Sequence, residues 1–221
     1  MILYRILQAI SYVIFKIFFK LKVAGRQYVP RKGGAILASN HSSYADILLI
    51  GCALRRRLRY VAKAEMFNGF FIRALWLYLG GIPIKRRGVP RESFKRIFDQ
   101  LNRGSLVVVF PEGTRSSDGE LKSAKLGIGM MAVLSEARII PTYISGSDQV
   151  LPSHSRKIKF HPVSVTYGPP VDYSDLMKKF EGKELYQAIS QRIMEKIQEL
   201  KLKKNIGASI GNKKKKQRSS I

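Results

Sequence analysis

The stretch GGAILASNHSSYADILLIGCAL, residues 33–54, sets a short polar segment between two apolar runs. The first run, 34–39, is short, continuous and apolar, which is typical of a strand buried on both faces. The second run, 46–54, indicates a buried helix. The polar segment NHSSYAD, 40–46, is therefore predicted to link a strand to a helix.

The rest of the chain continues this alternation. SLVVVF, 105–110, and IIPTYIS, 139–145, indicate further strands, and KIKFHPVSVTYG, 157–168, a strand or hairpin arm. Three further stretches indicate helices, 90–103, 124–137 and 184–204. Strands that alternate with helices predict an α/β fold: a single domain with a mixed, largely parallel sheet covered by helices.

The length of 221 residues suits one such domain. We expect a membrane-anchoring amphipathic helix over 1–24, the folded domain over 25–204 and a flexible basic tail over 205–221. No internal repeat is visible in the sequence.

Composition restricts the chemistry. Cys52 is the only cysteine, so an internal disulfide and a cysteine zinc site are excluded, and we expect no metal. The formal net charge is +25, with basic clusters at 55–59, 85–87 and 213–218. This charge predicts an anionic partner: nucleic acid, an anionic membrane surface or a phosphorylated substrate.

The first 22 residues are apolar, but the uncharged run between Arg5 and Lys16 is too short to span a bilayer. The polar residues recur every three or four positions: Arg5, Gln8, Ser11, Tyr12, Lys16 and Lys20. On a helix they form one narrow stripe beside a broad apolar face, which predicts a helix in a membrane interface. A core helix of the domain is the alternative, whereas a signal peptide and a snorkelling transmembrane helix fit less well.

The polar segment holds His41 and Asp46. On one continuous helix, side chains five positions apart point about 140° from each other, so the two can meet only if His41 precedes the helix. Ser42 or Ser43 would then cap the helix, and Asp46 would lie in its first turn. A carboxylate bound to imidazole makes a general-base unit that activates a hydroxyl. The alternative is a structural histidine and an aspartate that serves the helix dipole.

A second polar loop, FPEGTRS, follows the strand at 105–110. Gly113 can take a positive φ and bring backbone N–H groups toward a ligand, and Arg115 suits a phosphate. Glu112 can orient Arg115 or a hydroxyl. An ordinary turn with a surface arginine is the alternative. Since ligands gather at the carboxyl ends of strands in α/β sheets, both loops are expected to line one cleft.

Together, N-H-x-x-x-x-D and F-P-E-G-T-R-S resemble the glycerolipid acyltransferase family, and within it the enzymes that esterify lysophosphatidic acid to phosphatidic acid. The likeness covers about residues 25 to 170. Further similar blocks are VAKAEM at 61–66, GGIPIKR at 80–86, and Ile140-Pro141 with Gly146. Pro83 and Lys85 replace the family's commoner Phe and Asp, which leaves acceptor identity open.

The resemblance implies roles for nine residues. His41 would deprotonate the acceptor hydroxyl, with Asp46 as its orienting partner. The others would bind or shape the acceptor site: Lys63, Arg86 and Arg115 hold the phosphate, Glu112, Gly113 and Thr114 shape the pocket, and Lys125 adds positive charge.

The resemblance also implies the partners. The acceptor would be lysophosphatidic acid and the donor acyl-CoA or acyl carrier protein, with no cofactor, no metal and no nucleic acid. Attachment would be monotopic, to an anionic membrane surface on the cytoplasmic face. Alternatives are another acceptor (glycerol-3-phosphate, another lysophospholipid or a lyso-aminolipid) or a non-catalytic basic protein that binds lipid or nucleic acid.

Overall fold

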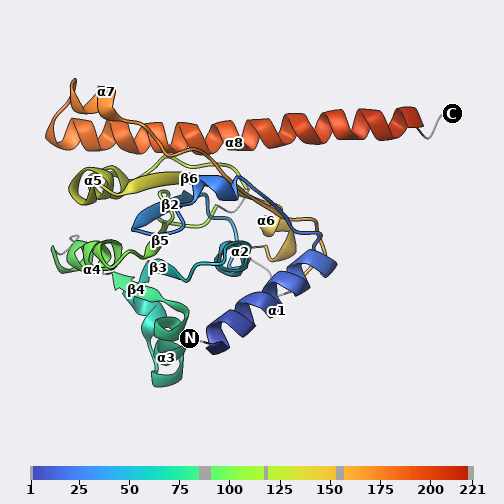
Figure 1. Cartoon of the computed structure of the whole chain (residues 1–221), viewed down its shortest axis with the longest axis horizontal. Helices are drawn as coiled ribbons and strands as arrows, with labels where there is room; N and C mark the ends of the chain where they lie inside the picture. The colour runs from blue at the N-terminus through green and yellow to red at the C-terminus, as the bar shows by residue number, and fades with distance from the viewer. Residues whose placement is uncertain (1, 85–90, 117–118, 153–156, 219–221) are drawn as a thin grey trace.

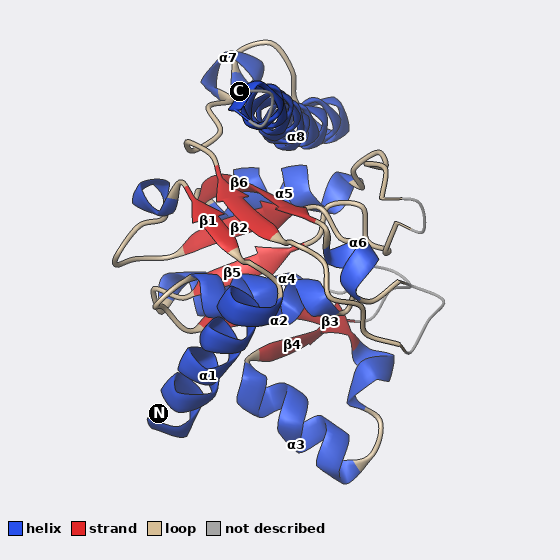
Figure 2. Cartoon of the chain, turned by 90° about the vertical axis from the view of Figure 1, so that its right-hand side faces the viewer, coloured by secondary structure: helices blue, strands red, loops and turns tan. Residues whose placement is uncertain are grey.

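The computed structural model describes residues 2–84, 91–116, 119–152 and 157–218. Its centre is a seven-stranded sheet with the order β1-β7-β6-β2-β5-β3-β4. Figure 2 shows the strands of this sheet in red, with helices in blue around them. The strands are β1 Lys22–Ala24, β2 Ala35–Ser39, β3 Leu58–Lys63, β4 Gly81–Ile84, β5 Leu106–Val109, β6 Arg138–Ser145 and β7 Ser164–Tyr167. Neighbouring strands are parallel except for β6 and β7, so the predicted mixed, largely parallel sheet is confirmed.

Helices cover both faces of this sheet (Figure 1). One apolar core joins the sheet to α1 and α2, and the other joins it to α4, α5 and α8. The helices are α1 Ile2–Phe18, α2 Ala45–Ala53, α3 Phe70–Leu79, α4 Arg91–Asn102, α5 Leu126–Ser135, α6 Ser147–Val150, α7 Ser174–Met177 and α8 Gly182–Arg218, with short 3-10 turns at Arg26–Tyr28 and Ala64–Phe67.

The central strands have the burial that their sequences predict. Every residue of β2 and of β5 is buried. Successive side chains point to opposite faces, so Ile36 enters the core under α5 and α8 while Leu37 enters the core under α2. Their continuous apolar runs are explained by helices on both faces.

Three predicted segments have different bounds. The amino-terminal helix, expected over 1–24, ends at Phe18, and Lys22–Ala24 form strand β1 of the sheet. Within 157–168, only Ser164–Tyr167 is a strand, because Pro162 has no N–H to donate and the residues before it are exposed. The last helix was expected to end at residue 204, yet α8 continues to Arg218. No proline interrupts 205–218, and the lysines at 213–216 are good helix formers, whereas Gly207 and Gly211 have low helix propensity.

Helix α1 packs on α2, where Gln8 Nε2 donates to the carbonyl oxygens of Gly51 and Leu54, both at 2.7 Å. Phe15 is the one buried residue of α1. Among the described residues, none of the helices has both the length and the apolar character to cross a bilayer.

Candidate active site

The two polar loops leave the same edge of the sheet. Strands β2 and β5 are parallel neighbours, with Ala38 opposite Val109, so NHSSYAD and FPEGTRS follow side by side. Ser116 N donates to His41 O at 2.7 Å, which ties one loop to the other. The predicted juxtaposition of the two loops at a carboxyl edge is therefore confirmed.

His41 and Asp46 form the expected pair. His41 Nδ1 lies 2.8 Å from Asp46 Oδ2; the Asp46 side chain is fully buried and that of His41 is 14% exposed. The same Oδ2 accepts from the backbone N–H groups of Ser42 at 2.8 Å and Ser43 at 2.9 Å. Three donors therefore fix the carboxylate, which fixes the ring.

The start of α2 differs in detail from the prediction. Tyr44, and neither Ser42 nor Ser43, is the N-cap residue. Ser43 Oγ still accepts from Ala45 N at 3.1 Å. The serine N–H groups point at Asp46 instead, so this carboxylate reaches back over the helix start.

The imidazole of His41 is held from a second side by Phe110. The two rings stack with centroids 3.9 Å apart and an angle of 16° between their planes. When Nδ1–H donates to Asp46, the lone pair lies on Nε2. Among the described residues, no group occupies Nε2 with a hydrogen bond. The geometry leaves that nitrogen available as a base.

Glu112 is buried at the junction of the loops. Its Oε1 accepts from His41 N at 3.3 Å and its Oε2 from Lys122 N at 3.1 Å. Burial raises the pKa of this carboxyl, and the two backbone donors oppose that rise. Glu112 thus anchors the backbone of the His41 loop and does not contact Arg115 through any described bond.

Gly113 has the positive φ that was expected, +69°. A Cβ there would lie 3.0 Å from Cδ and Cε of Lys125, so the absence of a side chain lets Lys125 extend along the loop. Lys125 N donates to Pro111 O at 2.9 Å, which fixes the start of α5 against the same loop. Thr114 is exposed at the loop tip.

Arg115 lies over the ring of Tyr44, with its guanidinium carbon 3.8 Å from the ring centroid. Its Nη2 also donates to Tyr44 Oη at 3.2 Å. Tyr44 is three residues after His41, so this contact brings the arginine to the His41 loop. Sequence reasoning missed Tyr44, because nothing in the sequence pairs it with a loop seventy residues away.

Asn40 was also missed. Its side-chain amide donates to Ile144 O at 2.9 Å and accepts from Ile144 N at 2.7 Å. These bonds fasten the end of β2 to β6, just before His41. A buried amide next to a candidate base was the available signal, since such a group needs partners.

Lys63 ends β3, two strands from β2 at the same edge, and is exposed. Within the described ranges, no carboxylate forms an ion pair with Lys63, Arg115 or Lys125. Arg86, the remaining predicted phosphate ligand, lies outside the described residues. The edge therefore combines a histidine–carboxylate pair with cations that lack anionic partners.

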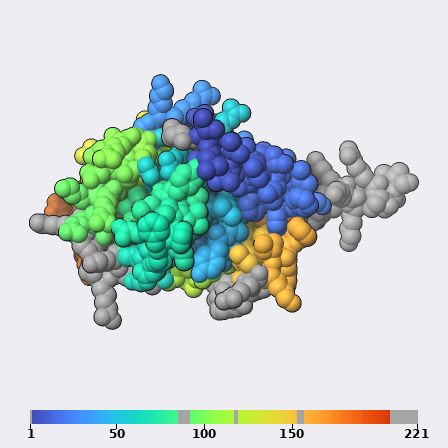
Figure 3. Space-filling model, turned by 90° about the horizontal axis from the view of Figure 1, so that it is seen from below, coloured from blue at the N-terminus to red at the C-terminus, as the bar shows by residue number. Residues whose placement is uncertain are grey.

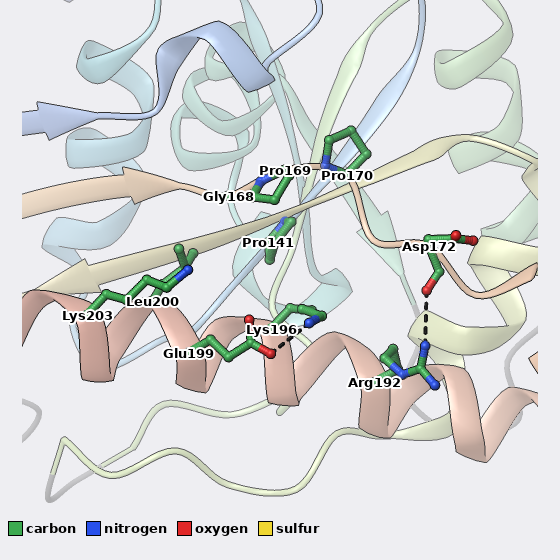
Figure 4. Close-up of a pocket in the computed structure, with 10 residues that line it drawn as sticks. All are labelled: Pro141, Gly168, Pro169, Pro170, Asp172, Arg192, Lys196, Glu199, Leu200 and Lys203. Carbon is green, nitrogen blue, oxygen red and sulfur yellow. Dashed lines mark hydrogen bonds and ion pairs between the residues drawn. The ribbon is translucent and has the colours of Figure 1, made fainter. Parts of the chain in front are cut away.

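A separate cavity of about 350 Å³ lies between α8 and the segment after β7 (Figure 4). Its walls include Pro141, Pro169 and Leu200, and among its charged groups Lys196 pairs with Glu199 at 2.7 Å. None of the predicted site residues lines it.

In the described part of the chain, the carboxyl edge of this α/β sheet holds a histidine paired with a carboxylate and cations without ion pairs, an arrangement that could bind an anionic ligand beside a base. The family model described as Acyltransferase matches residues 20–145, more than half of the chain. The protein belongs to the acyltransferase family.

Relatives agree with this assignment. The chain is 31% identical over 65% of its length to the chloroplastic 1-acyl-sn-glycerol-3-phosphate acyltransferase LPAT1 of Arabidopsis thaliana, but the match spans only 41% of that protein. It is 27% identical to a 1-acyl-sn-glycerol-3-phosphate acyltransferase of Bacillus subtilis, over 79% of this chain and 87% of that protein. The crystal structure of the 1-acyl-sn-glycerophosphate acyltransferase PlsC from Thermotoga maritima superimposes with a TM-score of 0.71 at 26% identity, covering 90% of this chain and 79% of that one.

Proposed function

We propose that the protein transfers a fatty acyl group to the free hydroxyl of 1-acyl-glycerol-3-phosphate, which gives phosphatidic acid in phospholipid synthesis. The observation that carries this proposal is the 2.8 Å contact between His41 and buried Asp46, beside the loop of Arg115, a cation that forms no ion pair with any described residue. Relatives named for this reaction support it.

In the proposed reaction, His41 Nε2 takes the proton of the acceptor hydroxyl as its oxygen attacks the thioester carbonyl of the donor. The tetrahedral intermediate then expels the thiolate, which takes the proton back from the imidazolium. Asp46 keeps Nδ1–H bonded and stabilises the imidazolium that forms in between. Atoms and charge balance without any cofactor, and no metal enters the proposed step.

The cations hold the acceptor. A glycerol phosphate carries up to two negative charges, and Arg115 can bind two of its oxygens with one planar guanidinium. Lys63 and Lys125 supply further positive charge at the same edge, and we assign Arg86 to the same role. Binding of the phosphate holds the acceptor hydroxyl close to His41 in an orientation suited to reaction, which lowers the entropic part of the barrier.

The donor in this proposal is acyl-CoA or acyl carrier protein. Both are anionic, as is the lipid surface from which the acceptor comes, and the formal net charge of +25 favours both encounters. No nucleic acid takes part in the proposed function.

We propose further that α1 lies in the interface of an anionic membrane, on the cytoplasmic face, as a monotopic attachment. Its partly buried side chains include Gln8, Ser11 and Tyr12, so much of its polar stripe faces the protein. Its apolar residues face outward: Ile2, Leu3, Ile6, Leu7, Ile10, Val13, Ile14, Ile17 and Phe18. A helix on the surface of a soluble protein normally turns its polar face to water and its apolar face to the core. In α1 the apolar side chains face outward, and a lipid interface would cover them.

Product analysis tests the reaction. Purified protein is offered lysophosphatidic acid, glycerol-3-phosphate or another lysophospholipid, each with acyl-CoA or acyl carrier protein, and products are identified by mass spectrometry. We expect phosphatidic acid as the main product, its loss in His41→Ala, and its retention in the matched control His161→Ala, which changes an exposed histidine. A different main product would reassign the acceptor, and full activity of His41→Ala would overturn the mechanism.

Extraction tests the attachment. If the apolar face of α1 is inserted, high salt leaves the intact protein on membranes and detergent releases it. Release by salt alone would mean that charge, and not insertion, holds it there.

A further inference from the structure

Helix α3, Phe70–Leu79, is a second apolar element that the fold does not bury. None of its ten residues is buried, and Phe71 is 84% exposed. It contains no acidic residue and one basic residue, Arg73. Its partly buried residues are Trp76, Tyr78 and Leu79, and the rings of Trp76 and Phe67 lie 6.0 Å apart.

Such a helix is unfavourable in water. Helices of this length are marginal unless an apolar face is packed against something, and exposed apolar patches of soluble proteins are small. Here the large side chains point outward: Phe70, Phe71, Ile72, Leu75 and Leu77. A partner that covers them is therefore expected.

One arginine connects α3 to α1. The guanidinium carbon of Arg57 lies 5.2 Å from the ring centroid of Tyr4 on α1 and 5.9 Å from that of Tyr78 on α3. Arg57 Nη2 also donates to the carbonyl oxygen of Tyr78 at 2.5 Å. The two helices consequently meet on one side of the molecule, where Figure 3 shows α1 in dark blue beside α3 in blue-green.

The charges around this face indicate which partner fits. Arg5, Arg55 and Arg73 are exposed on or beside the two helices. Glu65, just before α3, is the nearest acidic residue in sequence. Apolar side chains bordered by cations match the core and the headgroups of an anionic lipid leaflet.

We propose that α3 inserts into the same anionic leaflet as α1, with Arg57 holding the two helices as one docking surface. What this insertion implies for substrate binding rests on the proposed function. Lys63 and the turn Ala64–Phe67 lead directly into α3. Insertion of α3 therefore places the Lys63 end of the site at headgroup depth, where a lysophospholipid presents its phosphate.

The protein carries its own reporter for this proposal, because Trp76 on α3 is the only tryptophan of the chain. Full-length protein is titrated with vesicles of phosphatidylcholine and phosphatidylglycerol while its fluorescence is recorded. We expect emission to move to shorter wavelength, and lipids brominated on their acyl chains to quench it. The experiment is repeated with His41→Ala. Vesicle binding needs no turnover, so a failure of acyl transfer and a failure of α3 insertion give separate results.

The variant Phe71→Asp gives the second measurement. Its side chain makes no core contact, and its loss should weaken vesicle binding about tenfold. Leu134→Asp, an exposed leucine on α5, is the matched control and should bind as the unchanged protein does. Binding unaffected by Phe71→Asp, with Trp76 neither shifted nor quenched, overturns the proposal. So does a shift that occurs without vesicles and follows dimer formation in light scattering, since a second copy would then cover α3.

Discussion

The carboxyl edge of the sheet and the face made by α1 and α3 depart from an ordinary protein surface in opposite ways. At the edge, polar groups are buried: Asp46 and Glu112 are almost inaccessible, and each accepts from backbone donors. On the helical face, apolar groups are exposed, from Ile2 on α1 to Phe71 on α3.

This difference distinguishes groups whose interactions are satisfied within the protein from groups that a ligand could satisfy. The buried carboxylates are bonded within the chain, so the imidazole of His41 is already oriented in the protein without a ligand. Arg115 and the outward side chains of α1 have no such complement among the described residues: the first lacks an anion and the second lack an apolar cover. An amphiphile with an anionic head and acyl chains would supply both.

Replacing Asp46 should give the largest effect. Asp46→Asn keeps the shape but puts an amide where the imidazole and two backbone N–H groups donate, so His41 loses its tautomer and its charge partner. We expect kcat for acyl transfer to fall about 10³- to 10⁴-fold, measured by initial rates with saturating acceptor.

The matched control is Asp99→Asn, an exposed carboxylate on α4. It should keep its full rate. If Asp46→Asn were as active as this control, the contact between His41 and Asp46 would be structural only. The interpretation of the carboxyl edge as a site oriented for catalysis would then be wrong.

Removing Arg115 should affect binding more than chemistry. Arg115→Ala loses charge-assisted bonds to the acceptor phosphate, and we expect KM for lysophosphatidic acid to rise about 10- to 100-fold with a smaller change in kcat. Arg138→Ala is the control, because Arg138 begins β6 at the opposite edge of the sheet. A drop in kcat at unchanged KM would show that Arg115 acts on the reaction and not on the headgroup.

A charge on α1 tests the other half of the comparison. Ile10 is 50% exposed, and Ile10→Asp removes apolar contact with lipid and adds repulsion from an anionic surface. We expect vesicle partitioning, measured by sedimentation, to weaken about tenfold. Leu202→Asp on α8, where the leucine is 51% exposed, is the matched control. Equal partitioning of the two variants would mean that α1 does not face the lipid.

The sequence predicted the parts of the fold that local pattern determines. Short continuous apolar runs identified β2, β5 and β6, because strands buried on both faces carry apolar residues at successive positions. Strand β4 has only four residues, one of them Pro83, and β3 mixes exposed and buried positions, so neither has a clear period. Helix α3 was missed because nearly all of its residues are apolar or aromatic, with Arg73 as the one charge, so no polar face marks a helical period.

Within the site, spacing predicted the contact of His41 with Asp46, because five residues and a helix start determine it. The strand order that brings the second loop beside it was only assumed, and the structure confirms it. The contacts of Tyr44 with Arg115 and of Asn40 with Ile144 join residues far apart in sequence. Such pairs depend on tertiary packing, for which a single sequence carries no local signal.

The smallest expected effect concerns Glu112, which is buried at the junction of the two loops. Burial raises the pKa of its carboxyl above the ordinary value of 4.5. The native state then holds this proton more tightly than the unfolded chain, so the contribution to stability is complete below that ordinary value and decreases as pH rises through the native pKa. Glu112→Gln lacks a titrating group and should lack this decrease.

The free energy of unfolding, measured in urea at a series of pH values, tests this expectation. The difference between the unchanged protein and Glu112→Gln should shift in favour of the glutamine variant as pH rises above 4.5, and then become constant, while Glu184→Gln, an exposed carboxylate, gives the reference. A difference that moves the other way would mean that the N–H groups of His41 and Lys122 stabilise the carboxylate more than burial penalises it. Hydrogen bonds would then dominate at this junction, and the edge of the sheet would be even more strongly preorganised than the raised pKa implies.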